Sequence, residues 1–147
     1  MSAPRAAAII VSGGSGSRMG RPKQFLPLGG STVAELSTAC FAAMSEIESV
    51  VLVLGSDAYQ AHGARLSKGK VKVVPAGPTR MGSVRNGFAA LPSGVEVVAV
   101  HDGARSLITA EIVRSTIAEA AKSGAAVAAV PVKDTLKIVE AGGRVIT

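Results

Sequence analysis

A segment near the N-terminus combines small residues with two cations. Residues 12–23 read SGGSGSRMGRPK. Glycines allow backbone N–H groups to approach and surround a phosphate chain. Arg18 and Lys23 add fixed positive charge, which would stabilise charge developing on a transferring phosphoryl group, and we expect both to be catalytic. The residues expected to bind the nucleotide here are Ser12, Gly13, Gly14 and Gly16.

The spacing of this segment excludes two familiar phosphate-binding patterns. Gly14, Gly16 and Gly20 leave three residues before the last glycine, whereas the dinucleotide-binding fingerprint has two. The P-loop pattern needs Gly-Lys followed by Ser or Thr, which is absent here. A glycine-rich surface loop with two solvated cations is the competing interpretation.

A second cluster of reactive residue types is His101-Asp102-Gly103-Ala104-Arg105. It follows an apolar run, and ligands of open α/β sheets bind beyond the carboxyl ends of strands. Asp102 is expected to hold Mg²⁺ together with substrate phosphates, and Arg105 to grip a second anionic substrate. The alternative is a turn residue beside a surface arginine. His101 is assigned no chemistry.

Two further loops carry polar groups. The loop 77–83 enters a helix, and Gly77, Arg80 and Ser83 are candidates to contact a base or ribose. Ser83 serves equally well as a simple helix N-cap. The segment 131–137 places alternating polar groups beyond a fifth strand, with an exposed edge carrying solvated lysines as the alternative.

Strands and helices must hold these loops in place, and the pattern of apolar residues predicts where those elements lie. Unalternating, valine-rich runs predict strands covered on both faces. Helical spacing separates several of them, with Ser31 or Thr32 and Ser83 as N-caps and Gly124 as a C-cap. The expected strands are 6–11, 50–54, 71–74, 95–100 and 125–130; the expected helices lie around 33–44, 84–91 and 112–121. The fold class is therefore a doubly wound, mostly parallel Rossmann-like α/β sheet with helices on both faces.

The chain beyond Pro131 has a different pattern. Residues 133–140 and 144–147 flank Ala-Gly-Gly, a plausible hairpin turn. We therefore divide the chain into a nucleotide-binding core, 1–131, and a partial β-arm, 132–147.

Composition narrows the function classes. The chain has 147 residues, 48% hydrophobic and 18% charged, as expected for one folded domain. Its net charge of +6 favours an anionic partner, but aromatics make up only 3% and basic residues form no run, so we expect no nucleic-acid partner. The single cysteine, Cys40, gives no disulfide or metal framework. No apolar run approaches a membrane span and no signal-peptide pattern is present, which predicts a cytoplasmic protein without membrane contact.

Together, the four loops resemble the 2-C-methyl-D-erythritol 4-phosphate cytidylyltransferase family of non-mevalonate isoprenoid biosynthesis, from about Ala7 to Thr147. Pro22-Lys23-Gln24, Arg80 with Ser83, the 101–105 cluster and Asp134-Thr135-Leu136-Lys137 carry the resemblance. It implies transfer of a cytidylyl group from CTP to a polyol phosphate, with release of pyrophosphate and with Mg²⁺ on Asp102. Arg18 and Lys23 would act at the α-phosphorus.

The resemblance also assigns the acceptor and the partner. Arg105 and Thr135 would contact methylerythritol phosphate, Thr135 from the other subunit of a homodimer built through the C-terminal arm. Ser12 and Gly13 stand where the family usually has two alanines. The family's later Thr-Pro-Gln motif and basic residue are absent, which predicts binding of CTP and Mg²⁺ with weak or no turnover. Two alternatives stay open: another acceptor such as ribitol 5-phosphate, or a non-catalytic nucleotide- or RNA-binding protein.

Overall fold

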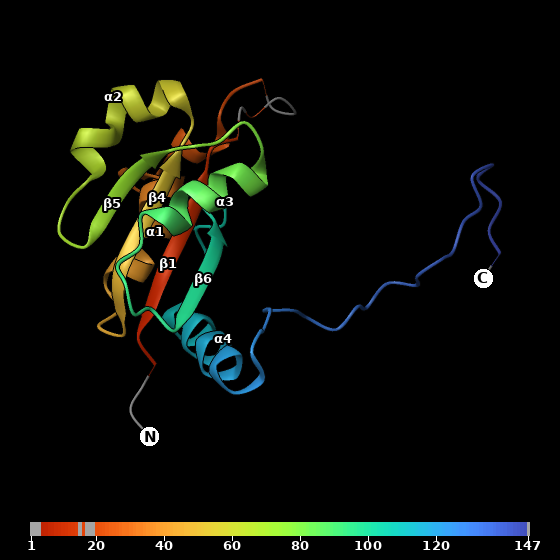
Figure 1. The fold of residues 1–147 in the computed structure, drawn as a ribbon. Helices are drawn as coiled ribbons and strands as arrows, with labels where there is room; N and C mark the ends of the chain where they lie inside the picture. Colours follow the sequence, from red (N-terminus) through yellow and green to blue (C-terminus); the bar gives the residue numbers. More distant parts are fainter. Residues whose placement is uncertain (1–3, 15, 17–19, 147) are drawn as a thin grey trace.

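A parallel sheet forms the centre of the protein, whose computed structural model describes residues 4–14, 16 and 20–146 (Figure 1). Four strands lie in the order β5-β4-β1-β6, and every neighbouring pair is parallel. The strands are β1 (Ala6–Ser12), β4 (Ile47–Leu54), β5 (Val71–Pro75) and β6 (Val97–Asp102). The first four predicted strands are therefore present, although β6 begins two residues later than expected.

Helices cover both faces of the sheet, which confirms the doubly wound architecture. Alternate residues of β1 point to opposite faces: Ala6, Ala8 and Ile10 join one buried cluster and Ile9 joins the other. The helices are α1 (Val33–Ala42), α2 (Ser56–Leu66), α3 (Arg80–Ala89) and α4 (Ala110–Ser123). The first cluster includes residues of α1, α2 and α4, whereas α3 packs on the second face.

The predicted caps are correct at two helices and wrong at one. Thr32 caps α1 in a reciprocal capping box with Glu35, and Gly124 ends α4 in the left-handed conformation with φ 89°. Thr79, rather than Ser83, caps α3, so this helix starts four residues earlier than expected. Its hydroxyl accepts a hydrogen bond from the backbone of Gly82, which satisfies a free donor of the first turn.

The short elements between β1 and α1 were not predicted from the sequence. A 3₁₀ turn, η2 (Lys23–Phe25), is followed by a two-stranded antiparallel ribbon of β2 (Pro27–Leu28) and β3 (Ser31–Thr32). Helix α2 was also missed. Gly63 is its only buried residue, so the helix lacks the apolar stripe that periodicity detects.

The predicted strand 125–130 is not formed. This run forms no regular secondary structure, is exposed and pairs with no strand of the described residues. β6 is the edge of the sheet, and Ala126–Ala128 line a pocket of about 480 Å³ together with Val97–Asp102. An apolar run indicates that a segment is stabilised by burial. A strand also requires a neighbouring strand to pair its backbone hydrogen bonds, and hydrophobicity alone does not show whether one is present.

The C-terminal arm forms the predicted turn without the predicted strands. Glu140 N donates to Arg144 O at 2.9 Å, and a single antiparallel bridge joins Val139 to Val145. The segment runs away from the sheet (Figure 1), and its described residues are exposed. The division into a core of 1–131 and an arm of 132–147 stays a prediction.

Candidate nucleotide-binding site

The carboxyl ends of the parallel strands meet at one edge of the sheet. Ser12 pairs with Leu54 and Val11 with Asp102, so the loops after β1 and β6 leave the sheet side by side. A pocket of about 870 Å³ opens at this edge. It is lined by Val11, Ser12, Gly13, Gly14, Gly16, Lys23, Gln24, Gly77, Pro78, Thr79, Arg80, Ser83, Asp102, Ala104 and Arg105. The structure thus brings together the candidates from three of the four loops.

The glycine-rich loop is held tightly on both sides. A Cβ on Gly13 would lie 2.7 Å from the Cβ of Ala76, and Gly16, with φ 70°, would place a Cβ onto the carbonyl of Arg21. Only glycine fits these close approaches. Ser12 is buried, and its hydroxyl has no hydrogen-bond partner in the described part of the chain. The hydroxyl lies against Gly103, where an added Cβ would overlap it, and we expect the backbone of Ser12 to be the group that meets a ligand.

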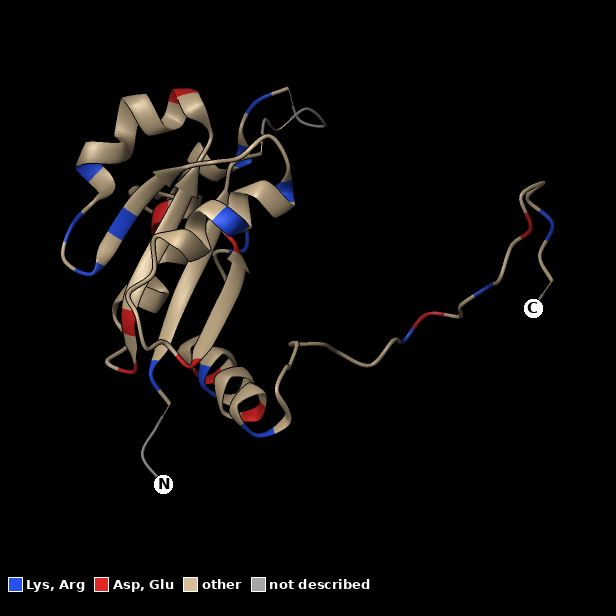
Figure 2. Ribbon diagram, in the orientation of Figure 1, with Lys and Arg blue, Asp and Glu red and all other residues tan. Residues whose placement is uncertain are grey.

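Lys23 is exposed and begins η2, where it lines the pocket. Pro22 precedes it in an extended conformation, with φ −64° and ψ 110°, and so directs the chain into this turn. Figure 2 shows basic positions on the loop beyond the end of β1 and at the start of α3. Arg18, the other expected catalytic cation, lies outside the described residues.

Ser83 organises the loop before α3 from the inside. Its buried Oγ accepts a hydrogen bond from Gly77 N at 3.2 Å and donates to Thr79 O at 2.9 Å. The hydroxyl is thus committed to holding Gly77 and Thr79 in place. The loop is prefolded, and its remaining backbone groups line the pocket.

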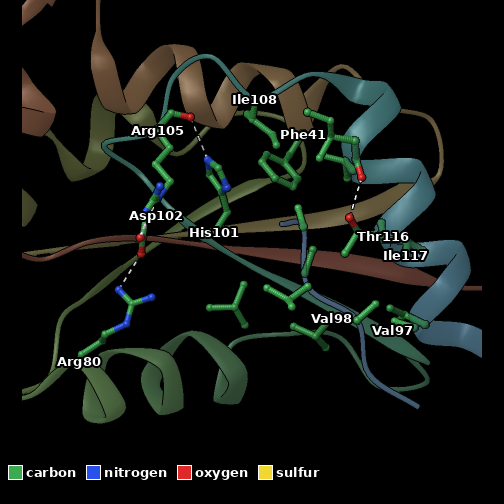
Figure 3. Close-up of a pocket in the computed structure, with 18 residues that line it drawn as sticks. Phe41, Arg80, Val97, Val98, His101, Asp102, Arg105, Ile108, Thr116 and Ile117 are labelled. Carbon is green, nitrogen blue, oxygen red and sulfur yellow. Dashed lines mark hydrogen bonds and ion pairs between the residues drawn. The ribbon is translucent and has the colours of Figure 1, made fainter. Parts of the chain in front are cut away.

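Asp102 stands between two guanidinium groups (Figure 3). Arg80 Nη1 lies 2.7 Å from Oδ1, and Arg105 Nε donates to Oδ2 at 3.1 Å. Partial burial by itself would raise the pKa of Asp102, but Arg80 and Arg105 outweigh it and hold the pKa below the usual aspartate value. The carboxylate is therefore charged at neutral pH and already faces two cations.

His101 supports the turn that carries these residues. Its Nε2 lies 3.1 Å from the carbonyl oxygen of Arg105 and must donate to it, because a carbonyl only accepts (Figure 3). The ring also packs against Phe41, with centroids 5.1 Å apart. Burial lowers the pKa of His101, although the hydrogen bond to Arg105 and the charge of Asp102 oppose the shift. His101 thus braces the loop through its backbone.

Thr135 is not brought to the pocket. It is exposed in the C-terminal segment and is absent from the lining of the 870 Å³ pocket. A contact from Thr135 would have to reach the site from another subunit, as expected from the sequence, or after a rearrangement of the arm.

Two relationships at the site were not predicted from the sequence. The side chain of Gln24 is buried beneath the glycine-rich loop, and Arg80 pairs with Asp102. Both are contacts between distant segments, so spacing along the chain carried no signal for them. Nothing in the described segments forms a cluster of three or more His, Cys, Asp or Glu side chains suited to a metal. None of the helices in the described ranges is long and apolar enough to span a membrane.

The sheet and its edge site define a nucleotidyltransferase-type α/β fold, and comparison with known proteins narrows the class. The model of the IspD family, 2-C-methyl-D-erythritol 4-phosphate cytidylyltransferase, matches residues 6–147. The chain belongs to this family.

Individual relatives agree with this assignment. The chain is similar to the bifunctional enzyme IspD/IspF of Anaeromyxobacter dehalogenans, at 42% identity over 96% of this chain and 36% of the relative. It is 40% identical to the 2-C-methyl-D-erythritol 4-phosphate cytidylyltransferase of Alkaliphilus metalliredigens, over 92% of this chain and 59% of the relative. The solved 4-diphosphocytidyl-2C-methyl-D-erythritol synthase of Anaerococcus prevotii superimposes with a TM-score of 0.84 at 30% identity, covering 98% of this chain and 63% of the other. The chain thus spans 36% to 63% of the length of these relatives.

Proposed function

We propose that the protein transfers a cytidylyl group from CTP to 2-C-methyl-D-erythritol 4-phosphate, giving 4-diphosphocytidyl-2-C-methyl-D-erythritol and pyrophosphate. The observation that carries the proposal is one pocket that joins a glycine-rich loop, Lys23 and the Asp102–Arg105 turn. Membership of the family supplies the reaction, and the names of the relatives supply the acceptor. A cytoplasmic location belongs to the same proposal.

The nucleotide would occupy the pocket with its phosphates on the glycine-rich loop. The backbones of Ser12, Gly13, Gly14 and Gly16 would surround them, while Gly77, Arg80 and Ser83 would define the end for the base and ribose. For Ser83 this role is indirect, because its hydroxyl is already bonded to Gly77 and Thr79. Lys23, assisted by Arg18, would face the α-phosphorus.

Cytidylyl transfer requires the protein to position the substrates and neutralise their charge, and it requires no covalent nucleophile from the protein. An oxygen of the acceptor phosphate attacks the α-phosphorus in line, and the bond to the bridging oxygen of pyrophosphate breaks. The acceptor phosphate is already anionic, so no general base is needed to activate it. Lys23 and Arg18 would stabilise the negative charge that builds on the equatorial oxygens.

Asp102 is suited to act as a ligand of a divalent cation, which we propose to be Mg²⁺. Its Oδ1 is buried and accepts no hydrogen bond from the described residues, although the Arg80 cation lies beside it. Mg²⁺ is usually held by one or two carboxylates together with substrate phosphates. A single carboxylate therefore suits an ion that arrives with the nucleotide and, when bound, neutralises charge on its phosphates.

Arg105 would bind the phosphate of the acceptor. Its guanidinium is exposed and contacts Asp102 through Nε, so it lies between the proposed metal ligand and solvent. Thr135 would come from the partner of a homodimer formed through residues 132–147. Apolar side chains of this arm are exposed in the single chain, including Leu136, Ile138 and Ile146, and burying them would favour such a contact.

The experiment is an assay of pyrophosphate release with CTP, Mg²⁺ and a panel of acceptors. We expect release with methylerythritol phosphate, at a weak rate, and less with ribitol 5-phosphate. Faster release with ribitol 5-phosphate would overturn the acceptor while leaving cytidylyl transfer in place. Binding of CTP without any release would restrict the proposal to the nucleotide half of the site.

A further inference from the structure

Gln24 is buried against the glycine-rich loop and contributes to the lining of the same pocket. It is 7% exposed and has the longest side chain among the buried polar residues described. Its Nε2 donates to Ser12 O at 2.9 Å and to Gly14 O at 2.8 Å. One side-chain amide thus holds two carbonyls that bracket Gly13.

These two bonds fix the orientation of the loop. The N–H of a trans peptide points opposite to its C=O, so a carbonyl of Ser12 held by Gln24 turns the N–H of Gly13 away from Gln24. Carbonyl oxygens repel phosphate oxygens, and Gln24 keeps two of them occupied. The loop is therefore held in one arrangement before any ligand binds.

The same side chain links the loop to the lysine. Gln24 follows Lys23 within the single turn η2, and Gly16 packs against the carbonyl of Arg21 just before that turn. The glycine-rich loop and the residues 21–24 thus contact each other at two points. A shift of Gln24 would move the backbone of Lys23 relative to the loop.

We propose that Gln24 is a positioning residue that fixes the glycine-rich loop and Lys23 in their mutual geometry for phosphate binding and transfer. This inference rests on the proposed function for the identity of the phosphate ligand. The ordering of the loop itself does not depend on that function. The two can therefore be tested separately.

The first experiment measures amide hydrogen exchange in the full chain without nucleotide. Gln24→Met keeps the length of the side chain but removes both hydrogen bonds, and we expect opening of residues 12–25 to become about tenfold more frequent, since each bond contributes about 0.5–1.5 kcal/mol. Exchange in α4 should not change. Gln60→Met is the matched control, because Gln60 is exposed on α2 and is the only other glutamine. Unchanged exchange in residues 12–25 would overturn the inference.

The second experiment measures the affinity for CTP with Mg²⁺ and the rate of pyrophosphate release. Gln24→Met should weaken CTP binding about tenfold and lower any measurable kcat, whereas a loss of folded protein would reduce the active fraction without changing the Kd. Gln60→Met should change neither. Tight CTP binding by Gln24→Met, with an unchanged kcat, would contradict the positioning role.

A variant that keeps the amide covers the case in which Gln24→Met does not fold. Gln24→Asn is shorter by one methylene and cannot reach both carbonyls from the same backbone position, so we expect faster exchange in residues 12–25 for this variant too. If Gln24→Asn exchanges like the wild type, the inference is wrong. If the wild-type chain itself binds no CTP, the proposed function fails, and hydrogen exchange still decides whether Gln24 orders the loop.

Discussion

Arg80 and Asp102, which both line the 870 Å³ pocket, form an ion pair with Nη1 2.7 Å from Oδ1. Arg80 begins α3 and Asp102 ends β6, so the pair joins the loop proposed for the base to the carboxylate proposed for the metal. Arg105 contacts the other oxygen of the same carboxylate. Asp102 is therefore charge-compensated before any cation binds.

This pairing predicts that Mg²⁺ binds weakly without nucleotide. A divalent cation on Asp102 must enter beside two guanidinium groups, whereas CTP brings negative phosphates that attract Arg80, Arg105 and the metal alike. Calorimetric titration with Mg²⁺ alone should show little heat, and Mg²⁺ should strengthen CTP binding. Asp102→Asn should remove that strengthening. A tight Mg²⁺ site in the absence of CTP, or an Asn variant that keeps the Mg²⁺ effect, would contradict the assignment.

Lys23→Ala tests the proposed charge stabilisation at the α-phosphorus. Removing one preorganised donor from a transition state lowers kcat by about 10²-fold or more, and we expect a loss of that size in pyrophosphate release. Lys68→Ala is the control, since Lys68 is exposed at the opposite end of the sheet, just before β5. An unchanged kcat in Lys23→Ala would place the phosphate site elsewhere.

Ser12 offers a test of the packing under the site. Its hydroxyl is buried and finds no partner in the described residues, and an unsatisfied buried polar group costs about 1–3 kcal/mol. Ser12→Ala should therefore leave the free energy of unfolding unchanged or raise it, as measured by urea denaturation. CTP binding should be retained, because the hydroxyl packs against Gly103 and we assign phosphate binding to the backbone of Ser12.

Gly103 completes that test, since a Cβ on it would overlap Ser12 Oγ. Gly103→Ala should lower the free energy of unfolding by about 1–3 kcal/mol, the usual cost of overpacking. The same substitution in a Ser12→Ala background should cost less. Equal costs in the two backgrounds would show that the serine hydroxyl is not what excludes a side chain at position 103.

We expect the carboxyl group of Glu35 to make the stability of α1 depend on pH. Its carboxylate accepts hydrogen bonds from the hydroxyl and N–H of Thr32 at 2.7 and 2.9 Å and pairs with Arg65. These contacts, led by the Thr32 hydroxyl and opposed by burial, lower the pKa of Glu35 from 4.5 to about 2. The folded pKa is depressed, so this stabilisation is complete above pH 4.5 and disappears as the pH falls through 2.

Glu35→Ala should therefore lower the free energy of unfolding at pH 7 by about 1 kcal/mol, the typical value of a helix cap. The difference from the wild type should shrink as the pH falls from 4.5 towards 2. Glu119→Ala, on the exposed surface of α4, should change the free energy by less than about 0.5 kcal/mol. If the difference in free energy of unfolding between Glu35→Ala and the wild type stays unchanged at low pH, the pKa of Glu35 is not lowered.

The sequence predicted the elements whose burial follows a simple pattern. β1 and β4 are buried on both faces and were visible as unbroken apolar runs. Thr32 was visible as a cap of α1 because it directly precedes a segment with helical spacing, whereas its partner Glu35 was not predicted. α2 was not visible, because it buries only a glycine, and the run 125–130 was mistaken for a strand because hydrophobicity does not reveal whether a pairing partner exists.

The site followed the same division. Lys23, Asp102 and Arg105 line one pocket, and they were predicted as site residues because they lie at or after the carboxyl ends of β1 and β6, where ligands of parallel sheets bind. Gln24 was named only as part of the Pro22-Lys23-Gln24 motif, and its contacts with Ser12 and Gly14 depend on how the chain folds back on itself. The contact of Arg80 with Asp102 joins two loops 22 residues apart, which no local pattern encodes.

Calorimetric titration of the folded chain with CTP in the presence of Mg²⁺ tests the central claim most directly. We expect saturable binding of CTP, weaker binding of ATP and GTP, and loss of affinity in Asp102→Asn. Absence of CTP binding by a chain with intact secondary structure, or equal displacement by any polyanion, would contradict it.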